Sequence, residues 1–225
     1  MGCTDDTPRV TTIADIYPIL GLRITAGPLE LRGISDEDIA ALADLAGRGV
    51  HPPDQMPFST PWTDTPAPEL PLRFAQYHWS TRASFARQGW MLDLTVVWEG
   101  AVVGTQGFRT QDYLVTRTGE TGSWLGREFQ GRGIGTRMRQ AMCAFLFDCL
   151  DAQELTSGAF VDNPASLAVS RKVGYGPNGR RRMVRRPGEW QANQGLILTP
   201  ETFVRGPEIK VEGLEPVRRL IGLEG

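Results

Sequence analysis

The chain has 225 residues, of which 40% are hydrophobic and 22% charged, which suffices for one packed domain and excludes a globally disordered chain. Its 24 basic and 26 acidic side chains give a net charge of −2, so long-range attraction to nucleic acid or to an anionic membrane is not expected. Three cysteines without a Cys-x-x-Cys spacing and only two histidines argue against a disulfide framework and a metal site. No apolar run approaches 18 residues. We therefore expect a soluble, cytoplasmic protein.

The first half of the chain predicts short strands and two helices. Residues 1–20 show no sustained periodicity, and we expect an N-terminal arm there. Residues 22–33 favour one or two strands, and residues 35–47 have the capped, periodic pattern of a helix. A loop rich in proline and aromatic residues spans 51–68, and a second helix is expected over about 70–88.

The second half predicts a hairpin and then alternating strands and helices. Residues 91–98 and 101–108 are two strand-like runs joined by Glu99-Gly100, which is typical of a hairpin turn. The remaining expected elements, in chain order, are an extended run at 116–125, a long helix after residue 135, a strand at 155–160, a helix capped at Asn163 that ends at Gly174, and strands at 180–186 and 195–199. This order predicts a mixed α/β domain over residues 21–204, followed by an appended segment over 205–225.

A glycine-rich segment, Gln130-Gly131-Arg132-Gly133-Ile134-Gly135-Thr136, lies where a predicted strand ends and a helix begins. Glycines let backbone N–H groups approach a ligand, and a helix start offers unpaired N–H groups and a positive dipole end. The pattern therefore suits a phosphate or pyrophosphate. It is neither a Walker A loop nor a good dinucleotide fingerprint. On spacing alone, a plain strand-to-helix turn is the alternative.

The same segment resembles the Gln/Arg-x-x-Gly-x-Gly/Ala signature of the GNAT acyl-CoA N-acyltransferases. Trp124-Leu125-Gly126-Arg127-Glu128-Phe129-Gln130 is similar to the RimJ/RimL branch of that family, which acetylates protein N-termini. A second block, Asn163-Pro164-Ala165-Ser166 followed by Ser170-Arg171-Lys172-Val173-Gly174-Tyr175, is similar to the family's Asn-x-x-Ser … Lys-Leu-Gly-Phe segment. The resemblance covers about residues 22–204. It implies a GNAT fold of the α/β (α+β) class, with a mostly antiparallel twisted sheet splayed in a V at the acetyl-CoA site and flanked by helices.

The resemblance also implies where acetyl-CoA binds. The strand ending at Leu125 would be bulged and would splay from the strand at 155–160, so that the pantetheine arm pairs with its backbone. A main-chain N–H near Leu125 would polarise the thioester carbonyl. The residues implied to bind the cofactor are Trp124, Leu125, Gly126, Arg127, Gln130, Gly131, Arg132, Gly133, Ile134, Gly135, Thr136, Asn163, Ser166 and Arg171.

The implied reaction is direct attack of a primary amine on the thioester, and two residues are the expected catalysts. Ser170 stands where most family members have a tyrosine, and it would protonate the leaving thiolate; the alternative is a helix serine bonded to its own backbone. Glu120 is the expected base, with Asp93 and Asp112 as alternatives. Tyr175 is expected in the core.

The amine acceptor is expected at the proline-aromatic loop and the second helix, where family members build the acceptor site. The expected acceptor-binding residues are His51, Met56, Phe58, Trp62, Tyr77 and His78. The acceptor is a protein N-terminus or a small-molecule amine. A non-catalytic acyl-CoA-binding module is the alternative function, and nucleic-acid binding through the arginine run at 180–186 is disfavoured by the acidic chain. Leu214, Leu220 and Leu223 predict that the last segment packs on a second subunit, as a homodimer, or on its own domain.

Overall fold

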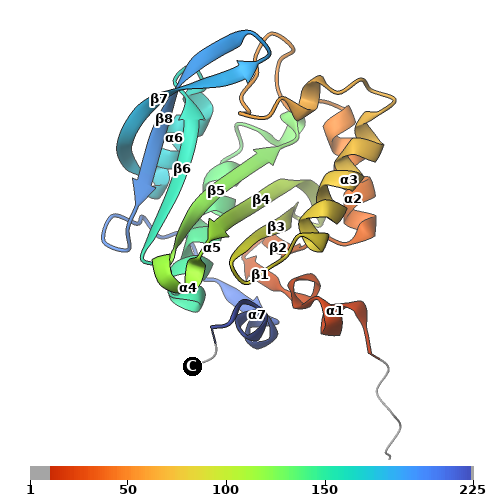
Figure 1. The fold of residues 1–225 in the computed structure, drawn as a ribbon, viewed down its shortest axis with the longest axis vertical. Coiled ribbons are helices and arrows are strands. Elements are labelled where there is room, and N and C mark those ends of the chain that lie inside the picture. Colours follow the sequence, from red (N-terminus) through yellow and green to blue (C-terminus); the bar gives the residue numbers. More distant parts are fainter. Residues whose placement is uncertain (1–10, 224–225) are drawn as a thin grey trace, which may run out of the picture.

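One nine-stranded sheet organises the computed structural model, which describes residues 11–223 (Figure 1). Its strand order is β7-β8-β6-β5-β4-β3-β2-β1-β9, and only the β5–β6 pair is parallel. The expected mixed, mostly antiparallel sheet is confirmed. The strands are β1 (Arg23–Ala26), β2 (Leu29–Gly33), β3 (Gly89–Trp98), β4 (Ala101–Gln111), β5 (Thr118–Leu125), β6 (Glu154–Phe160), β7 (Gly176–Arg186), β8 (Glu189–Leu198) and β9 (Lys210–Glu212).

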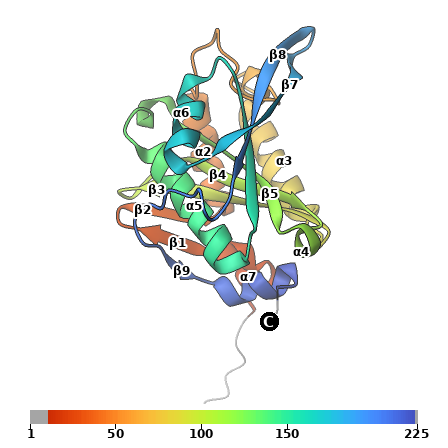
Figure 2. The ribbon, with the colours of Figure 1, turned by 90° about the vertical axis from the view of Figure 1, so that its left-hand side faces the viewer.

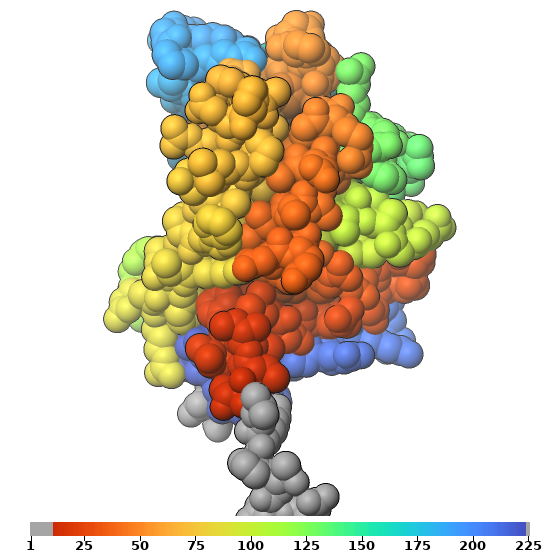
Figure 3. All heavy atoms as spheres, turned by 90° about the vertical axis from the view of Figure 1, so that its right-hand side faces the viewer, coloured from red at the N-terminus to blue at the C-terminus, as the bar shows by residue number. Residues whose placement is uncertain are grey.

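Helices cover the sheet on both faces. Two of them, α2 and α3, lie side by side on one face, as the space-filling view in Figure 3 shows. The opposite face carries α5, with α6 beside it (Figure 2). The α-helices are α1 (Ile13–Ile16), α2 (Asp36–Gly47), α3 (Leu70–Ala83), α4 (Tyr113–Thr116), α5 (Ile134–Leu150), α6 (Pro164–Val173) and α7 (Leu214–Ile221).

Local sequence signals explain most of these boundaries. Helix α2 begins after Ser35, whose side chain accepts the N–H of Asp38 while the Asp38 carboxylate accepts the N–H of Ser35. The turn between β3 and β4 places both Glu99 and Gly100 at positive φ, as a two-residue hairpin turn requires. Helix α3 ends at Ala83, earlier than the expected residue 88, because Ala86 and Gly89 exchange two backbone hydrogen bonds and turn the chain into β3.

The two ends of the described chain pack against one edge of the sheet. A short 3-10 helix (Pro18–Gly21) buries Ile19, although residues 1–20 were expected to form an arm; residues 1–10 lie outside the described part. At the other end, β9 pairs with β1, and α7 buries Val217 and Ile221 in the main core. The C-terminal segment therefore packs on its own domain, which is one of the two expected arrangements.

Candidate active site

Strands β5 and β6 separate halfway along β5 and leave a V-shaped gap. They pair only from Thr118 to Glu120, although β5 stays paired with β4 as far as Leu125. Strand β6 follows β8 instead, to which it is paired from Leu155 to Phe160. The expected splay is thus present. The expected bulge in β5 is wrong: its register with β4 is regular, and the irregularity lies between β3 and β4, where Val103 is the extra residue.

Backbone groups of β5 line this gap. The carbonyl of Thr121 accepts a hydrogen bond from Ser157 Oγ of β6 at 3.1 Å, so it points toward β6. Alternate residues of a strand point their N–H and C=O to the same side, which turns those of Ser123 and Leu125 toward the gap as well. Neither residue has a partner in β6. The N–H groups of both residues and the carbonyl of Ser123 therefore face the gap, where an extended ligand could pair as an added strand.

The glycine-rich turn forms an open cradle at the start of α5. Gly131 and Gly133 have φ values of +76° and +79°, and no atom lies within 4 Å of where a Cβ would stand on either. Helix α5 has Gly133 as its N-cap and no side-chain cap, so the N–H groups of Ile134 and Gly135 precede its first internal hydrogen bonds. This cradle fits the pyrophosphate of coenzyme A.

The other expected cofactor residues divide into two groups. Arg127 and Arg132 form no ion pair with a carboxylate of the described chain, whereas Gln130, Asn163 and Ser166 already take part in hydrogen bonds of the fold. Gln130 Nε2 donates to the carbonyls of Val50 at 2.7 Å and Leu125 at 2.9 Å, which fixes the turn. Asn163 and Ser166 form the cap of α6, in which Asn163 Oδ1 accepts the backbone N–H of Ser166 at 3.1 Å. Trp124 packs toward α3, and Gly126 lies against Leu45. Thr136 is in the first turn of α5, and Arg171 is exposed on α6.

Ser170 is fully buried on α6. Its Oγ donates to the carbonyl of Ser166 at 3.0 Å, which is the backbone bond of a helix serine. Tyr175 lies in the core as expected, with its hydroxyl 2.8 Å from Thr121 Oγ1 and burial raising its pKa well above the usual value.

The expected base, Glu120, is held by an arginine. Arg109 on the neighbouring strand approaches Glu120 Oε2 to 2.6 Å with one nitrogen and to 3.2 Å with another. Both side chains line a cavity of about 560 Å³ on the sheet face that carries α3, together with Met91, Thr118 and Thr156. Asp112, an alternative base, is exposed and precedes α4.

Asp93 on β3, the other alternative, has the surroundings of a base. Its side chain is 14% exposed, and Tyr77 Oη donates to Oδ2 at 3.2 Å. Burial raises the pKa of Asp93 to about 6 despite that hydrogen bond, which acts in the opposite direction. His78 Nδ1 lies 4.0 Å away, but burial lowers the pKa of His78 to about 4, so the ring is neutral and forms no ion pair at neutral pH.

Glycines keep the sheet between Asp93 and the gap free of side chains. Asp93 pairs with Gly107, and Gly107 pairs with Gly122, so the three residues form a row across the strands. Beyond the gap, Gly158 pairs with Gly195. A Cβ on Gly107 would collide with Asp93 Oδ1, whereas one on Gly122 would meet nothing within 4 Å. The carboxylate of Asp93 therefore leans over Gly107 toward the gap.

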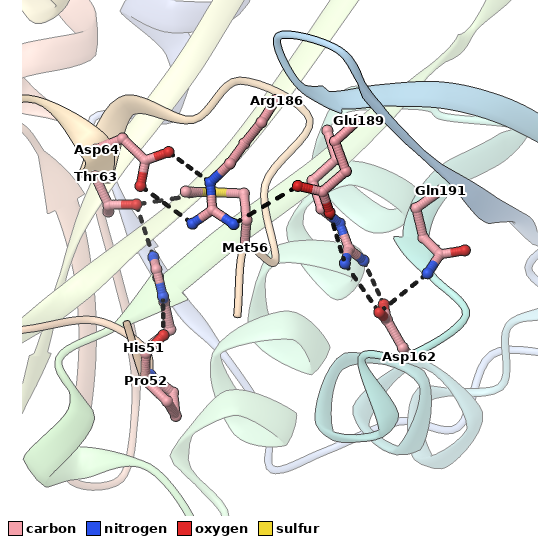
Figure 4. A network of polar contacts seen from close by, with 10 residues as sticks. His51, Pro52, Met56, Thr63, Asp64, Asp162, Arg186, Glu189 and Gln191 are labelled. Atoms are coloured by element: carbon pink, nitrogen blue, oxygen red, sulfur yellow. Dashed lines mark hydrogen bonds and ion pairs between the residues drawn. The ribbon is translucent and has the colours of Figure 1, made fainter. Parts of the chain in front are cut away.

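Aromatic side chains of the loop, β5 and α3 pack together on the sheet face that carries α3. Ring centres of Trp62 lie 5.3 Å from Phe58 and 5.5 Å from Trp124, and Phe74 completes the group. The expected acceptor residues do not all point into it, because Met56 is 1% exposed and packs inside the loop. His51 hydrogen-bonds the carbonyl of Pro52 and Thr63 Oγ1, at 2.8 Å and 2.7 Å, and so supports the loop (Figure 4).

An ion pair joins the aromatic loop to the β7–β8 hairpin. Arg186 Nε lies 2.7 Å from Asp64 Oδ2, and Arg185 next to it pairs with Asp162 (Figure 4). Figure 3 shows the loop and the hairpin next to each other at this end of the molecule. The Asp64–Arg186 and Asp162–Arg185 pairs therefore tie the hairpin to the loop and to the start of α6.

Among residues 11–223, no helix combines the length and apolar character needed to cross a bilayer. No group of three histidine, cysteine, aspartate or glutamate side chains there is arranged to hold a metal ion.

Comparison with known proteins gives consistent results. Residues 28–176 match the acetyltransferase (GNAT) domain family. The chain is 28% identical over 91 residues to "Putative ribosomal N-acetyltransferase YdaF" of Bacillus subtilis (strain 168), a match covering 40% of this chain and about half, 49%, of that protein.

Solved structures share the fold. RimJ of Mycobacterium smegmatis in complex with CoA-disulfide has a TM-score of 0.61 at 18% identity, covering 88% of this chain and 92% of that one. A Salmonella typhimurium acetyl transferase that modifies the N-terminal serine of ribosomal protein L7/L12 has a TM-score of 0.62 at 18% identity, covering 76% and 95%. A structure of RimL with coenzyme A has a TM-score of 0.61 at 19% identity, covering 76% and 94%. With the family match spanning more than half of its length, this chain belongs to the GNAT acetyltransferases, enzymes that use acetyl-CoA.

Proposed function

We propose that this protein transfers the acetyl group of acetyl-CoA to the α-amine of a protein N-terminus, with ribosomal proteins as the first acceptors to test. The V-shaped gap and the glycine cradle support a donor site, and the cavity of about 560 Å³ on the sheet face that carries α3 supports a nearby acceptor site. Relatives named as ribosomal acetyltransferases share the family or the fold, which supports the choice of acceptor.

The observation that carries the proposal is the Asp93 carboxylate, which leans over Gly107 toward the gap. A base with a pKa of about 6 remains ionised at neutral pH. An α-ammonium group has a pKa of about 8, so it gives up its proton to such a base far more readily than a lysine, with a pKa of about 10.4. An acceptor site next to Asp93 therefore suits an N-terminal amine better than a lysine side chain.

One residue or backbone group is proposed for each step of the transfer. Acetyl-CoA supplies the activated thioester when bound. The amide groups of Ser123 and Leu125 would hold the carbonyl oxygen, and Asp93 would accept the proton of the attacking amine. Ser170 would give a proton to the leaving thiolate by exchanging its bond to the Ser166 carbonyl. Glu120 is the second candidate base, but its pairing with Arg109 makes it the weaker one.

Peptides test the proposal directly. The two peptide sets differ only at the N-terminus and at one internal position: one has a free N-terminus and no lysine, and the other has a blocked N-terminus and a single lysine. With acetyl-CoA, we expect mass spectrometry to show a single acetyl group on the first set and little or none on the second. Acetylation of the lysine set alone would contradict the proposal. Binding of acetyl-CoA without turnover of any peptide or small amine would favour the non-catalytic binding module.

A further inference from the structure

Helix α5 places a buried arginine at the V-shaped gap. Arg139 is 4% exposed, and its guanidinium lies 5.9 Å from the centre of the Tyr175 ring. Nη2 donates to Ser123 Oγ of β5 at 2.9 Å, and Nη1 donates to Ser157 Oγ of β6 at 3.3 Å. These serines lie just beyond the last paired residues, so Arg139 spans the gap where the strands begin to separate.

No carboxylate of the described chain pairs with this arginine. The contrast is with Arg185, the other buried arginine there, which contacts both Asp162 and Glu189. Arg139 has only neutral hydroxyl partners, and its Nε has no hydrogen-bond partner. A buried cation without a counter-charge is costly, so an anion that enters the gap would be bound strongly.

The position of Arg139 indicates which anion that is. The pyrophosphate cradle lies at the first turn of α5, whereas Arg139 is further along the helix and faces the strands at the closed end of the gap. An acyl-pantetheine arm that pairs with β5 brings its acyl end to this place. Acetyl carries no charge that could pair with a guanidinium, but an acyl chain that ends in a carboxylate does.

We propose that Arg139 binds a terminal carboxylate on the acyl group of the donor, so that the gap selects the coenzyme A thioester of a short dicarboxylic acid, such as succinyl-CoA, over acetyl-CoA. A guanidinium and a carboxylate form paired, charge-assisted hydrogen bonds. The hydroxyls of Ser123 and Ser157 can turn to donate to the same carboxylate. The inference rests on the proposed acyl transfer and goes beyond it in the identity of the acyl group.

The chemistry at the thioester is unchanged. The amine nitrogen forms a C–N bond to the carbonyl carbon, the C–S bond breaks, and its electron pair leaves with sulfur. The amine proton passes to the base, and the thiolate takes up a proton to become coenzyme A. The distal carboxylate remains at Arg139 and takes no part in the reaction.

Calorimetric titration of the full chain tests the preference without relying on turnover. The four probes are coenzyme A, acetyl-CoA, succinyl-CoA and succinamoyl-CoA, in which an uncharged amide replaces the distal carboxylate. We expect succinyl-CoA to bind at least about tenfold more tightly than acetyl-CoA or succinamoyl-CoA, or about 1.4 kcal/mol. Equal affinities for the three thioesters would overturn the proposal.

A variant tests whether Arg139 is the cause of the succinyl preference. In Arg139→Met, we expect the succinyl preference to disappear while coenzyme A binds within about twofold of the original protein. A preference that survives in this variant would reject Arg139 as its cause. The four-probe comparison on the unaltered chain still decides the matter if the variant misfolds. Failure of every peptide to react with either acetyl-CoA or succinyl-CoA would reject the proposed function but leave these affinities measurable.

Discussion

The proposed donor site and the proposed acceptor site, which lie on either side of β5, differ in the groups that form them: one is mainly backbone and the other mainly side chains. On the donor side, the cradle and the gap present backbone: glycines at positive φ, the start of α5 and the unpaired edge of β5. The proposed acceptor site consists instead of side chains from distant segments: Asp93 of β3, Tyr77 of α3 and Trp62 of the loop. Donor binding should therefore respond to backbone changes, and turnover to single side chains.

The largest expected effect is on turnover, from the side chain of Asp93. We expect Asp93→Asn to lower kcat at pH 7.5 by about 10²–10³-fold, because loss of a general base has effects of that size. Glu120→Gln should cost less than about tenfold, since Glu120 is held by Arg109. In the original protein, the rate should fall below about pH 6 as Asp93 is protonated, and the variant should lack this limb.

Steady-state kinetics with a saturating free-N-terminal peptide measure both variants. Affinity for coenzyme A, measured by titration, is the control and should change by less than about twofold in each. A larger loss in Glu120→Gln than in Asp93→Asn would reverse the assignment of the base and restore the prediction made from the sequence.

The next effect concerns the backbone of the donor side. Gly133 has a φ of +79°, which a β-branched residue adopts only with strain, and its Cβ would stand in the cradle. We expect Gly133→Val to weaken coenzyme A binding by about 10–100-fold. Gly176→Ala is the matched control, because it is a strand glycine with open space and no positive φ. Equal affinities of the two variants would contradict the cradle.

The difference between the two sides also decides what the sequence could predict. Glycine spacing and helix periodicity are local, so the turn at Gly131 and Gly133, helix α5 and the cap at Asn163 follow from short segments. The fold followed from the family resemblance carried by these blocks. The environment of Asp93 did not, because its burial depends on α3 and on Gly107, which lies on another strand.

Glu120 and Arg139 show the same limit from opposite directions. Sequence position favoured Glu120 as the base, but its cross-strand partner Arg109 depends on the β4–β5 register. Arg139 falls in a helix pattern where nothing local separates it from the exposed arginines, and only the packed structure shows that it is buried and without a carboxylate. The pairing of glycines in neighbouring strands was the one signal that, with the register known, would have identified Asp93.

A third prediction concerns stability at the same acceptor side chain. The folded-state pKa of Asp93 is above its usual value, so its contribution to the free energy of unfolding is complete below about pH 4 and is lost as the pH rises through about 6. Asp93→Asn should therefore raise the free energy of unfolding by up to about 3 kcal/mol at pH 7.5, and by little at pH 4.

Thermal melts at the two pH values measure this difference, and Glu120→Gln serves as the control without such an effect. A variant that is more stable yet less active would mark Asp93 as a residue retained for function. Equal melting temperatures at pH 7.5 would show that the carboxylate is solvated and is not a perturbed base.

The smallest expected effect tests the ion pair between the aromatic loop and the β7–β8 hairpin. Asp64 and Arg186 have side chains that are 43% and 26% exposed, and such pairs contribute less than about 1 kcal/mol to folding. Asp64→Asn should therefore leave the melting temperature nearly unchanged but free the loop from the hairpin, which raises KM for the peptide about two- to fivefold and leaves coenzyme A affinity alone. Asp148→Asn on α5 is the control, because it breaks a comparable exposed pair with Arg205. An equal change of KM in both variants would assign the effect to surface charge. A change in Asp64→Asn alone would show that the Asp64–Arg186 pair contributes to acceptor binding. In that case, 1 M salt should reproduce the change in the original protein.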